Sequence, residues 1–122
     1  MSTNLQATYS MIVARLLEEK RENQGISQAE FLGRAGLTQS SWSRVNRGLS
    51  HFSLEELRAA CIAVNADITT IIGQSEMAAS ALPDAEGVSI IENTKASDNK
   101  SLIPTIIAAA ALGFLIARLM RR

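Results

Sequence analysis

The sequence has little of the chemistry on which most enzymes and disulfide-stabilised domains depend. It contains one cysteine, Cys61, and one histidine, His51, so an internal disulfide and an ordinary zinc site built from protein ligands are both excluded. It also shows no nucleophile–base pair and no phosphate-cradling glycine loop. We therefore expect a binding protein rather than an enzyme, with no cofactor and no metal. A lone cysteine suits a reducing cytosol, and the N-terminus does not resemble a secretory signal.

Aromatic residues are also scarce, at 4%, whereas hydrophobic residues reach 47% and are dominated by Ala, Leu and Ile. This composition predicts an all-α fold. The formal net charge is zero, but the charge is unevenly distributed along the chain. Residues 76–101 carry two basic against five acidic side chains, and residues 102–122 carry three arginines and no acid.

Apolar residues at helical spacing and capping residues predict five short helices within residues 6–75. The first spans about 6–22. Ser27 with Glu30, and Ser53 with Glu56, form sequence capping boxes that start the second and fourth helices. Thr38 and Asp67 can cap the third and fifth, and the fifth closes near Gly73. The buried stripe of the fourth helix is expected to include Leu54, Leu57, Ala60, Cys61 and Val64.

The turn between the second and third helices is the most informative part of the chain. Gly36 suits the left-handed conformation that a residue without Cβ enters cheaply, and Gly48 ends the third helix. Two short capped helices joined by such a turn predict a helix-turn-helix. In the third helix, Trp42 is expected to face the core.

Residues 10–73 resemble the XRE family of helix-turn-helix domains, to which phage repressors and Cro proteins belong. The matching residues are Arg21, Gln28, Ala29, Gly36, Thr38, Gln39, Val45, Arg47, Gly48 and the opening of the fourth helix at 53–56. The resemblance implies a five-helix, λ-repressor-like bundle that binds double-stranded DNA.

The resemblance also implies roles for individual side chains. Gln28 corresponds to a glutamine that contacts the phosphate backbone, and a helix N-terminus attracts anions. Base-reading positions fall on the third helix, where Gln can pair with adenine and Arg with guanine. The predicted DNA-binding residues are Gln28, Thr38, Gln39, Ser40, Ser43, Arg44 and Arg47.

One departure from the family concerns Asn46. The family usually has a glutamate there, and that acid pairs with a first-helix arginine that corresponds to Arg21. In this sequence, Arg21 is expected to bond Asn46 or another acid.

Residues 76–101 contain Pro83, Gly87 and several Ser and Asn, which predicts a flexible acidic linker. Residues 102–117 carry no charge, and residues 102–120 predict a single hydrophobic helix that serves as a membrane anchor. A very hydrophobic helix buried in an oligomer is the alternative. Ala109, Gly113 and Ala117 lie four residues apart, which predicts a helix-dimerisation face and a possible homodimer.

Two functions remain open from the sequence. The first is a bacterial or phage transcriptional regulator that binds specific DNA and is tethered to the inner membrane by its C-terminus, with the DNA-binding domain in the cytoplasm. The alternative is a membrane-anchored interaction module that uses the same fold to bind a protein partner such as a cytoskeletal element.

Overall fold

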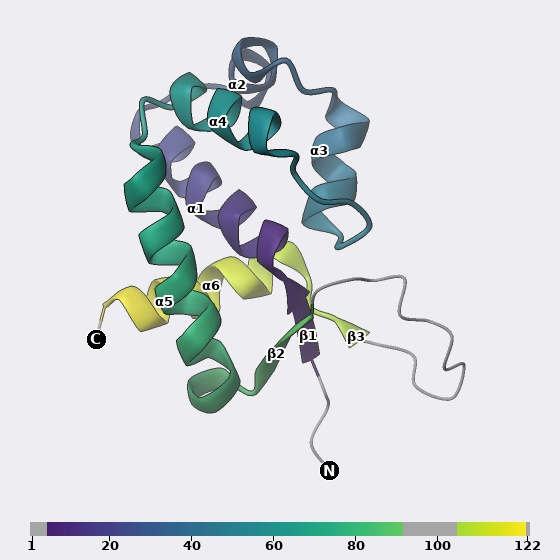
Figure 1. The fold of residues 1–122 in the computed structure, drawn as a ribbon, viewed down its shortest axis with the longest axis vertical. Coiled ribbons are helices and arrows are strands. Elements are labelled where there is room, and N and C mark those ends of the chain that lie inside the picture. The colour runs from purple at the N-terminus through teal and green to yellow at the C-terminus, as the bar shows by residue number, and fades with distance from the viewer. Residues whose placement is uncertain (1–4, 92–104, 122) are drawn as a thin grey trace.

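The computed structural model describes residues 5–91 and 105–121, and its elements are shown in Figure 1. The helices and strands, in chain order, are β1 (Leu5–Thr8), α1 (Tyr9–Asn23), α2 (Gln28–Ala35), α3 (Gln39–Asn46), α4 (Leu54–Ala63), α5 (Ile68–Glu86), β2 (Val88–Ile91), β3 (Thr105–Ile106) and α6 (Ala109–Met120). Helices α1 to α5 form the predicted bundle. In the described part of the chain α6 joins it, so the packed unit has six helices and not five.

Local sequence signals account for where most helices begin. The Ser53 hydroxyl accepts from the Glu56 backbone N–H at 3.0 Å, and the Glu56 carboxylate accepts from the Ser53 N–H at 2.9 Å, so the predicted capping box is confirmed. Asp67 caps α5 by accepting from the Thr70 N–H at 3.1 Å. The first helix starts later than expected, at Tyr9, because the Thr8 hydroxyl caps it by accepting from the Met11 N–H at 3.0 Å.

The core lies between α1 and the surrounding helices. Ile12 and Leu17 of α1 are fully buried, as are Phe31 of α2 and Ile71 of α5. The predicted stripe of α4 is confirmed at Leu57, Ala60, Cys61 and Val64. It is wrong at Leu54, which is 80% exposed because it is the first residue of the helix and faces solvent.

A small parallel sheet was not expected from the sequence and corrects the all-α prediction. Its strand order is β2-β1-β3, with Leu5 opposite both Val88 and Thr105. Figure 1 shows the sheet at one end of the bundle, where the first strand lies between two strands from the C-terminal part of the chain. The sheet therefore joins the two ends of the sequence.

The linker predicted over 76–101 is corrected for residues 76–91. Helix α5 continues to Glu86, with Pro83 in its last turns, and ends where Gly87 adopts a left-handed φ of 70°. Its Ala78 and Leu82 are buried, so the second half of α5 packs on the bundle rather than leaving it. Strand β2 follows directly. Residues 92–101 of the predicted linker lie outside the described residues.

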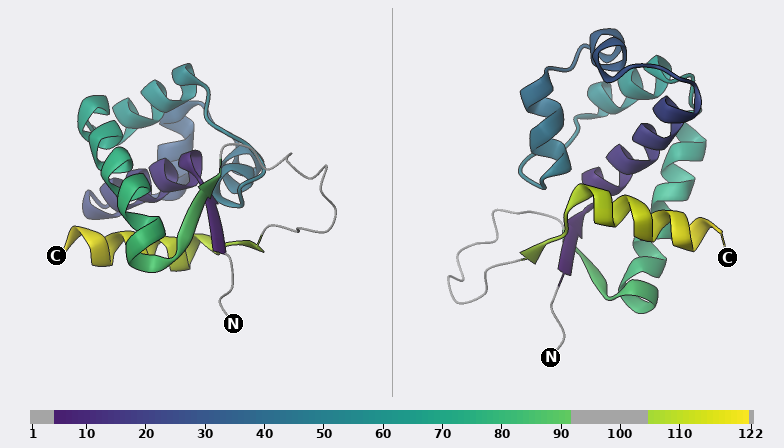
Figure 2. Two further views of the ribbon diagram at one scale, coloured as in Figure 1. Left: turned by 60° about the horizontal axis from the view of Figure 1, so that its bottom comes forward. Right: turned by 180° about the vertical axis from the view of Figure 1, so that it is seen from behind.

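The predicted hydrophobic tail forms β3 and α6, and residues 102–104 lie outside the described part. Helix α6 crosses α1, as Figure 2 shows from behind, and also contacts α5. Leu112 and Ile116 of α6 are buried. In residues 5–91 and 105–121, no helix is long and apolar enough to cross a membrane. Of the apolar residues that predicted an anchor at 102–120, Ile107, Leu112 and Ile116 are buried against the bundle in the described structure.

Candidate functional site

Helix α3 is held against the bundle by its apolar face. Trp42 is 3% and Val45 2% exposed, so the prediction that Trp42 belongs to the core is confirmed. The Trp42 ring meets the Phe31 ring of α2 edge-on, with centroids 5.0 Å apart and planes inclined at 74°. Aromatic pairs favour this geometry. The contact fixes α3 relative to α2 and turns the opposite face of α3 outward.

Side-chain caps start α2 and α3, and a left-handed glycine forms the turn between them. Ser27 caps α2 by accepting from the Glu30 N–H at 3.1 Å, but the Glu30 carboxylate pairs with Arg34, so only this half of the predicted capping box is present in the described structure. Gly36 ends α2 with φ at 71°, in the left-handed region that favours glycine. The Thr38 hydroxyl caps α3 by accepting from the Ser41 N–H at 3.0 Å, so it is already engaged at the helix start.

The outward face of α3 presents polar side chains to solvent. Gln39, Ser40 and Arg44 are exposed, and Arg47 is exposed at the end of the helix. Neither Arg44 nor Arg47 is ion-paired within residues 5–91 and 105–121, whereas Arg34 of α2 pairs with Glu30. The face is therefore polar and locally positive, with side chains available for a partner.

Two of the predicted DNA-binding residues are less exposed to solvent than the others. Gln28 is the first residue of α2 and is half-buried, at the helix end where backbone N–H groups attract anions. Ser43 is also half-buried, because it faces the C-terminal segment instead of open solvent. The DNA contacts assigned to all seven residues stay predictions.

Sequence reasoning missed that the C-terminal segment lies beside α3. A shallow hollow between them is lined on the α3 side by Ser43, Asn46 and Arg47 and on the other side by Ile106, Ile107, Ala108 and Ala109. Gly48, with φ at 77°, approaches the same segment. A Cβ there would lie 3.3 Å from Ile106 Cγ2. No local signal could have revealed this contact, since more than fifty residues separate Gly48 from Ile106.

Asn46 is bound by a different arginine from the one expected. The guanidinium of Arg15 on α1 donates to Asn46 Oδ1. Asn46 Nδ2 in turn donates to the Trp42 carbonyl at 2.8 Å. Arg21 pairs with another acid, Glu18, and donates to the Ile26 carbonyl at 2.6 Å. The second expectation for Arg21 is confirmed, and Arg15 is the residue that connects α1 to α3.

Burial lowers the pKa of Arg15, and the charges of Glu18 and Glu22 oppose this effect. Its Nε is buried and has no hydrogen-bond partner in the described part of the chain. The acceptor of the Arg15 guanidinium on α3 is therefore the neutral amide of Asn46.

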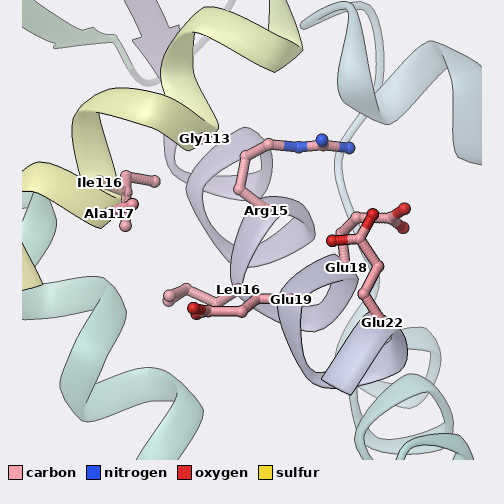
Figure 3. Close-up of a pocket in the computed structure, with 8 residues that line it drawn as sticks. All are labelled: Arg15, Leu16, Glu18, Glu19, Glu22, Gly113, Ile116 and Ala117. Atoms are coloured by element: carbon pink, nitrogen blue, oxygen red, sulfur yellow. The ribbon is translucent and has the colours of Figure 1, made fainter. Parts of the chain in front are cut away.

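Two of the three small residues of the predicted dimerisation face, Gly113 and Ala117, lie beside α1 of the same chain, and dimerisation through this face stays a prediction. A Cβ on Gly113 would lie 3.4 Å from Arg15 Cδ, and Gly113 and Ala117 line a pocket together with residues of α1. Figure 3 shows Gly113 directly beside the Arg15 side chain. Ala109 borders the hollow beside α3 instead. Gly113 lets α6 cross α1 closely, because a bulkier side chain there would meet Arg15.

The remaining titratable groups provide no metal site in the described residues, where no cluster of His, Cys, Asp or Glu could hold an ion. Cys61 is buried in α4. Burial, and to a lesser extent the charge of Asp67, raises the pKa of its thiol. A buried thiol with a raised pKa is a poor nucleophile.

Comparison with known proteins identifies one part of the chain. Residues 12–70 match a family model described as a helix-turn-helix domain. No curated protein and no solved structure matches the chain. The matched segment covers most of α1, all of α2 to α4 and the start of α5, so it includes the two helices and the turn described above. Strand β1, most of α5 and the C-terminal elements lie outside it.

Proposed function

We propose that the protein is a sequence-specific, double-stranded DNA-binding regulator of the XRE type, which binds rather than catalyses. The observation that carries this proposal is the outward face of α3. This face is fixed by the Trp42–Phe31 contact, and it presents Gln39, Ser40 and Arg44 to solvent, with only the Ser40 hydroxyl bonded, to Thr38 Oγ1 at 3.4 Å. Side chains of these types read base edges in the major groove.

In the proposed complex, the two helices of the motif have different tasks. Gln39, Ser40 and Arg44 lie along the groove, where amide and guanidinium groups pair with adenine and guanine. Gln28 at the start of α2 and Arg47 after α3 hold phosphates on either side. Phosphate contacts fix the register, and base contacts select the sequence.

The net charge of the protein limits its affinity for DNA of unrelated sequence. A formal net charge of zero gives little counterion release, so affinity for unrelated DNA is expected to be weak. The local charge is more favourable, because Arg44 and Arg47 have no acidic partner in the described residues. Most of the binding free energy at the preferred site must then come from base contacts and a few phosphate contacts.

Binding-site selection from random DNA at physiological salt tests the proposal. Wild-type protein should enrich one sequence, and Arg44→Ala should lose about 1–3 kcal/mol of discrimination at one base pair. Arg58→Ala is the matched control, since Arg58 is an exposed arginine on α4 and not on α2 or α3. Failure to enrich any sequence would contradict DNA reading and favour a protein partner for this surface.

A second variant separates phosphate contacts from base reading. Arg47→Ala should weaken binding to all sequences by a similar factor and reduce the salt dependence by about one counterion. The selected sequence should not change. An altered sequence preference would place Arg47 among the base-reading residues instead.

The proposal places the domain in the cytoplasm of a bacterium or an infected bacterium, because that is where its DNA would be. Fractionation of cells that express the full chain tests this location. Recovery with the nucleoid or cytosol supports it, and digestion of the domain by protease added outside intact spheroplasts contradicts it.

A further inference from the structure

The side chain of Arg15 connects three helices. It starts on α1, and its guanidinium donates to Asn46 at the end of α3. Its aliphatic part lies against Gly113 of α6, because a Cβ on that glycine would be only 3.4 Å from Arg15 Cδ. Figure 3 shows the two residues side by side. Contact with α6 therefore restricts the positions that the Arg15 side chain can take.

Arg15 also borders open space. A pocket of about 250 Å³ between α1 and α6 is lined by Arg15 itself, by Glu18, Glu19 and Glu22, and by apolar residues of both helices. Glu18 and Glu19 follow Arg15 at the i+3 and i+4 spacings, at which opposite charges meet on a helix. Arg15 nonetheless pairs with no acid in the described part of the chain. A second position, facing these carboxylates, is thus open to its guanidinium.

The observed position of Arg15 is costly for a charged group. Its Nε is buried and has no hydrogen-bond partner among the described residues, and its acceptor on α3 is a neutral amide. A buried charge is ordinarily stabilised by an acid, and acids stand on the same helix. The bond to Asn46 does not by itself explain this preference. The packing of α6 against the aliphatic part of Arg15 supplies the missing constraint.

Asn46 transmits the position of Arg15 to the rest of α3. Its Nδ2 donates to the Trp42 carbonyl at 2.8 Å, and the Trp42 ring packs edge-on against Phe31. The Arg15 bond therefore braces the last turn of α3 on α1. Without this bond, apolar contacts alone would hold that end of the helix, and its outward face would be less firmly oriented.

We infer that Arg15 is the positioning residue of α3 and that α6 keeps it in place. With α6 docked, Arg15 stays on Asn46. When α6 is crowded or displaced, the side chain turns into the pocket towards Glu18 and Glu19, and α3 loses its brace. Helix α6 lies outside the segment that matches the helix-turn-helix family, so an element beyond the motif controls its geometry. The effect on DNA reading rests on the proposed function, whereas the coupling of α6 to α3 does not.

NMR of the full chain tests this coupling without DNA. Trp42 is the only tryptophan, so its indole N–H gives a single signal from α3. The Arg15 Nε–H signal reports whether that group is buried. Gly113→Leu should shift the Trp42 signal and speed hydrogen exchange at Arg15 Nε about 10-fold or more, because the new side chain displaces Arg15. Ala111→Leu, at an exposed position of α6, is the matched control and should change neither signal.

A second variant separates the action of Arg15 from general crowding. Arg15→Met should shift the Trp42 signal in the same direction as Gly113→Leu. Adding Gly113→Leu to Arg15→Met should then shift it little further, because the transmitting residue is gone. Circular dichroism checks folding, and Gly113→Val replaces the leucine variant if that one does not fold. An unmoved Trp42 signal in Arg15→Met, or additive shifts in the double variant, would overturn the inference.

Binding to the selected DNA sequence tests the functional consequence. Gly113→Leu and Arg15→Met should each raise the dissociation constant for that sequence about 10-fold. Affinity for unrelated DNA should not change, since the proposed phosphate contacts are intact. Together the two changes should cost no more than either alone. A wild-type protein that selects no sequence refutes the proposed function, and the NMR result then decides the coupling. An unaltered dissociation constant, in a variant whose Trp42 signal has moved, refutes control of DNA reading by α6.

Discussion

The Arg15 guanidinium of α1 donates to the side-chain carbonyl of Asn46 at the end of α3, and this bond ties the central helix to the helix with the predicted reading face. The side-chain amide of Asn46 donates in turn to the Trp42 backbone carbonyl. The acceptor is a neutral amide, so the contact is a hydrogen bond to a charged group and not an ion pair. Such bonds contribute about 1.5–3 kcal/mol.

A double-mutant cycle measures this bond. Asn46→Ala should lower the free energy of unfolding by about 1–3 kcal/mol, because it leaves a half-buried guanidinium without its acceptor. In an Arg15→Met background, the same change should cost markedly less, since Met fills similar space without a charge. Urea denaturation provides the four free energies. Additive effects would show that the two residues act independently.

A substitution at Leu112 tests whether α6 belongs to the folded unit. The Leu112 side chain is fully buried, so Leu112→Ala should lower the free energy of unfolding by about 2–5 kcal/mol through lost burial and a cavity. Ala110→Ser, at an exposed position of the same helix, should change it by less than about 0.5 kcal/mol. The measurement is thermal unfolding without detergent. Equal stability of both variants would contradict the packing of α6 on the bundle.

Gly48 tests the contact between the α3 loop and the C-terminal segment. Gly36→Ala adds a Cβ in open space and should cost only the left-handed strain, about 1–2 kcal/mol. Gly48→Ala should cost more, because its Cβ would also lie 3.2 Å from Met11 Sδ and 3.3 Å from Ile106 Cγ2. Shortening the neighbour by Ile106→Ala should reduce the excess. If the excess persists, the strain arises at Met11.

The environment of Tyr9 predicts that the stability of the folded state depends on pH in the alkaline range. Burial, the hydrogen bond to Glu76 and the charge of Glu76 together raise the pKa of Tyr9 to about 12, although the Ser75 hydroxyl opposes them. The folded state thus holds the phenolic proton more tightly than the unfolded chain, whose tyrosine pKa is about 10. The resulting stability is fully present below pH 10 or so, and it is lost as the pH rises towards about 12.

Tyr9 is the only tyrosine, so the absorbance of tyrosinate reports this pKa directly. Glu76→Gln should lower it, since it removes the negative charge, but burial should keep it above the unfolded value. Glu55→Gln, on α4, is the control and should leave the pKa unchanged. A wild-type value near that of free tyrosine, in protein shown to be folded, would contradict the contact between α1 and α5.

The sequence by itself determined the elements whose signals are local. The caps at Ser27, Thr38, Ser53 and Asp67 and the left-handed Gly36 mark helix ends through bonds between residues three or four apart. These signals place the helix-turn-helix correctly, because each bond forms within a single turn of chain. The polar face of α3 follows from the same pattern once Trp42 and Val45 are turned inward.

Only the tertiary structure decided how the C-terminal part of the chain pairs and packs. Strand β1 has no strand pattern of its own and forms because Val88 and Thr105 pair with Leu5 from distant parts of the chain. An apolar run such as that of α6 suits a membrane, an oligomer or a bundle equally well. Which one it uses depends on the surface that receives it, and here α1 and α5 provide that surface for Leu112 and Ile116.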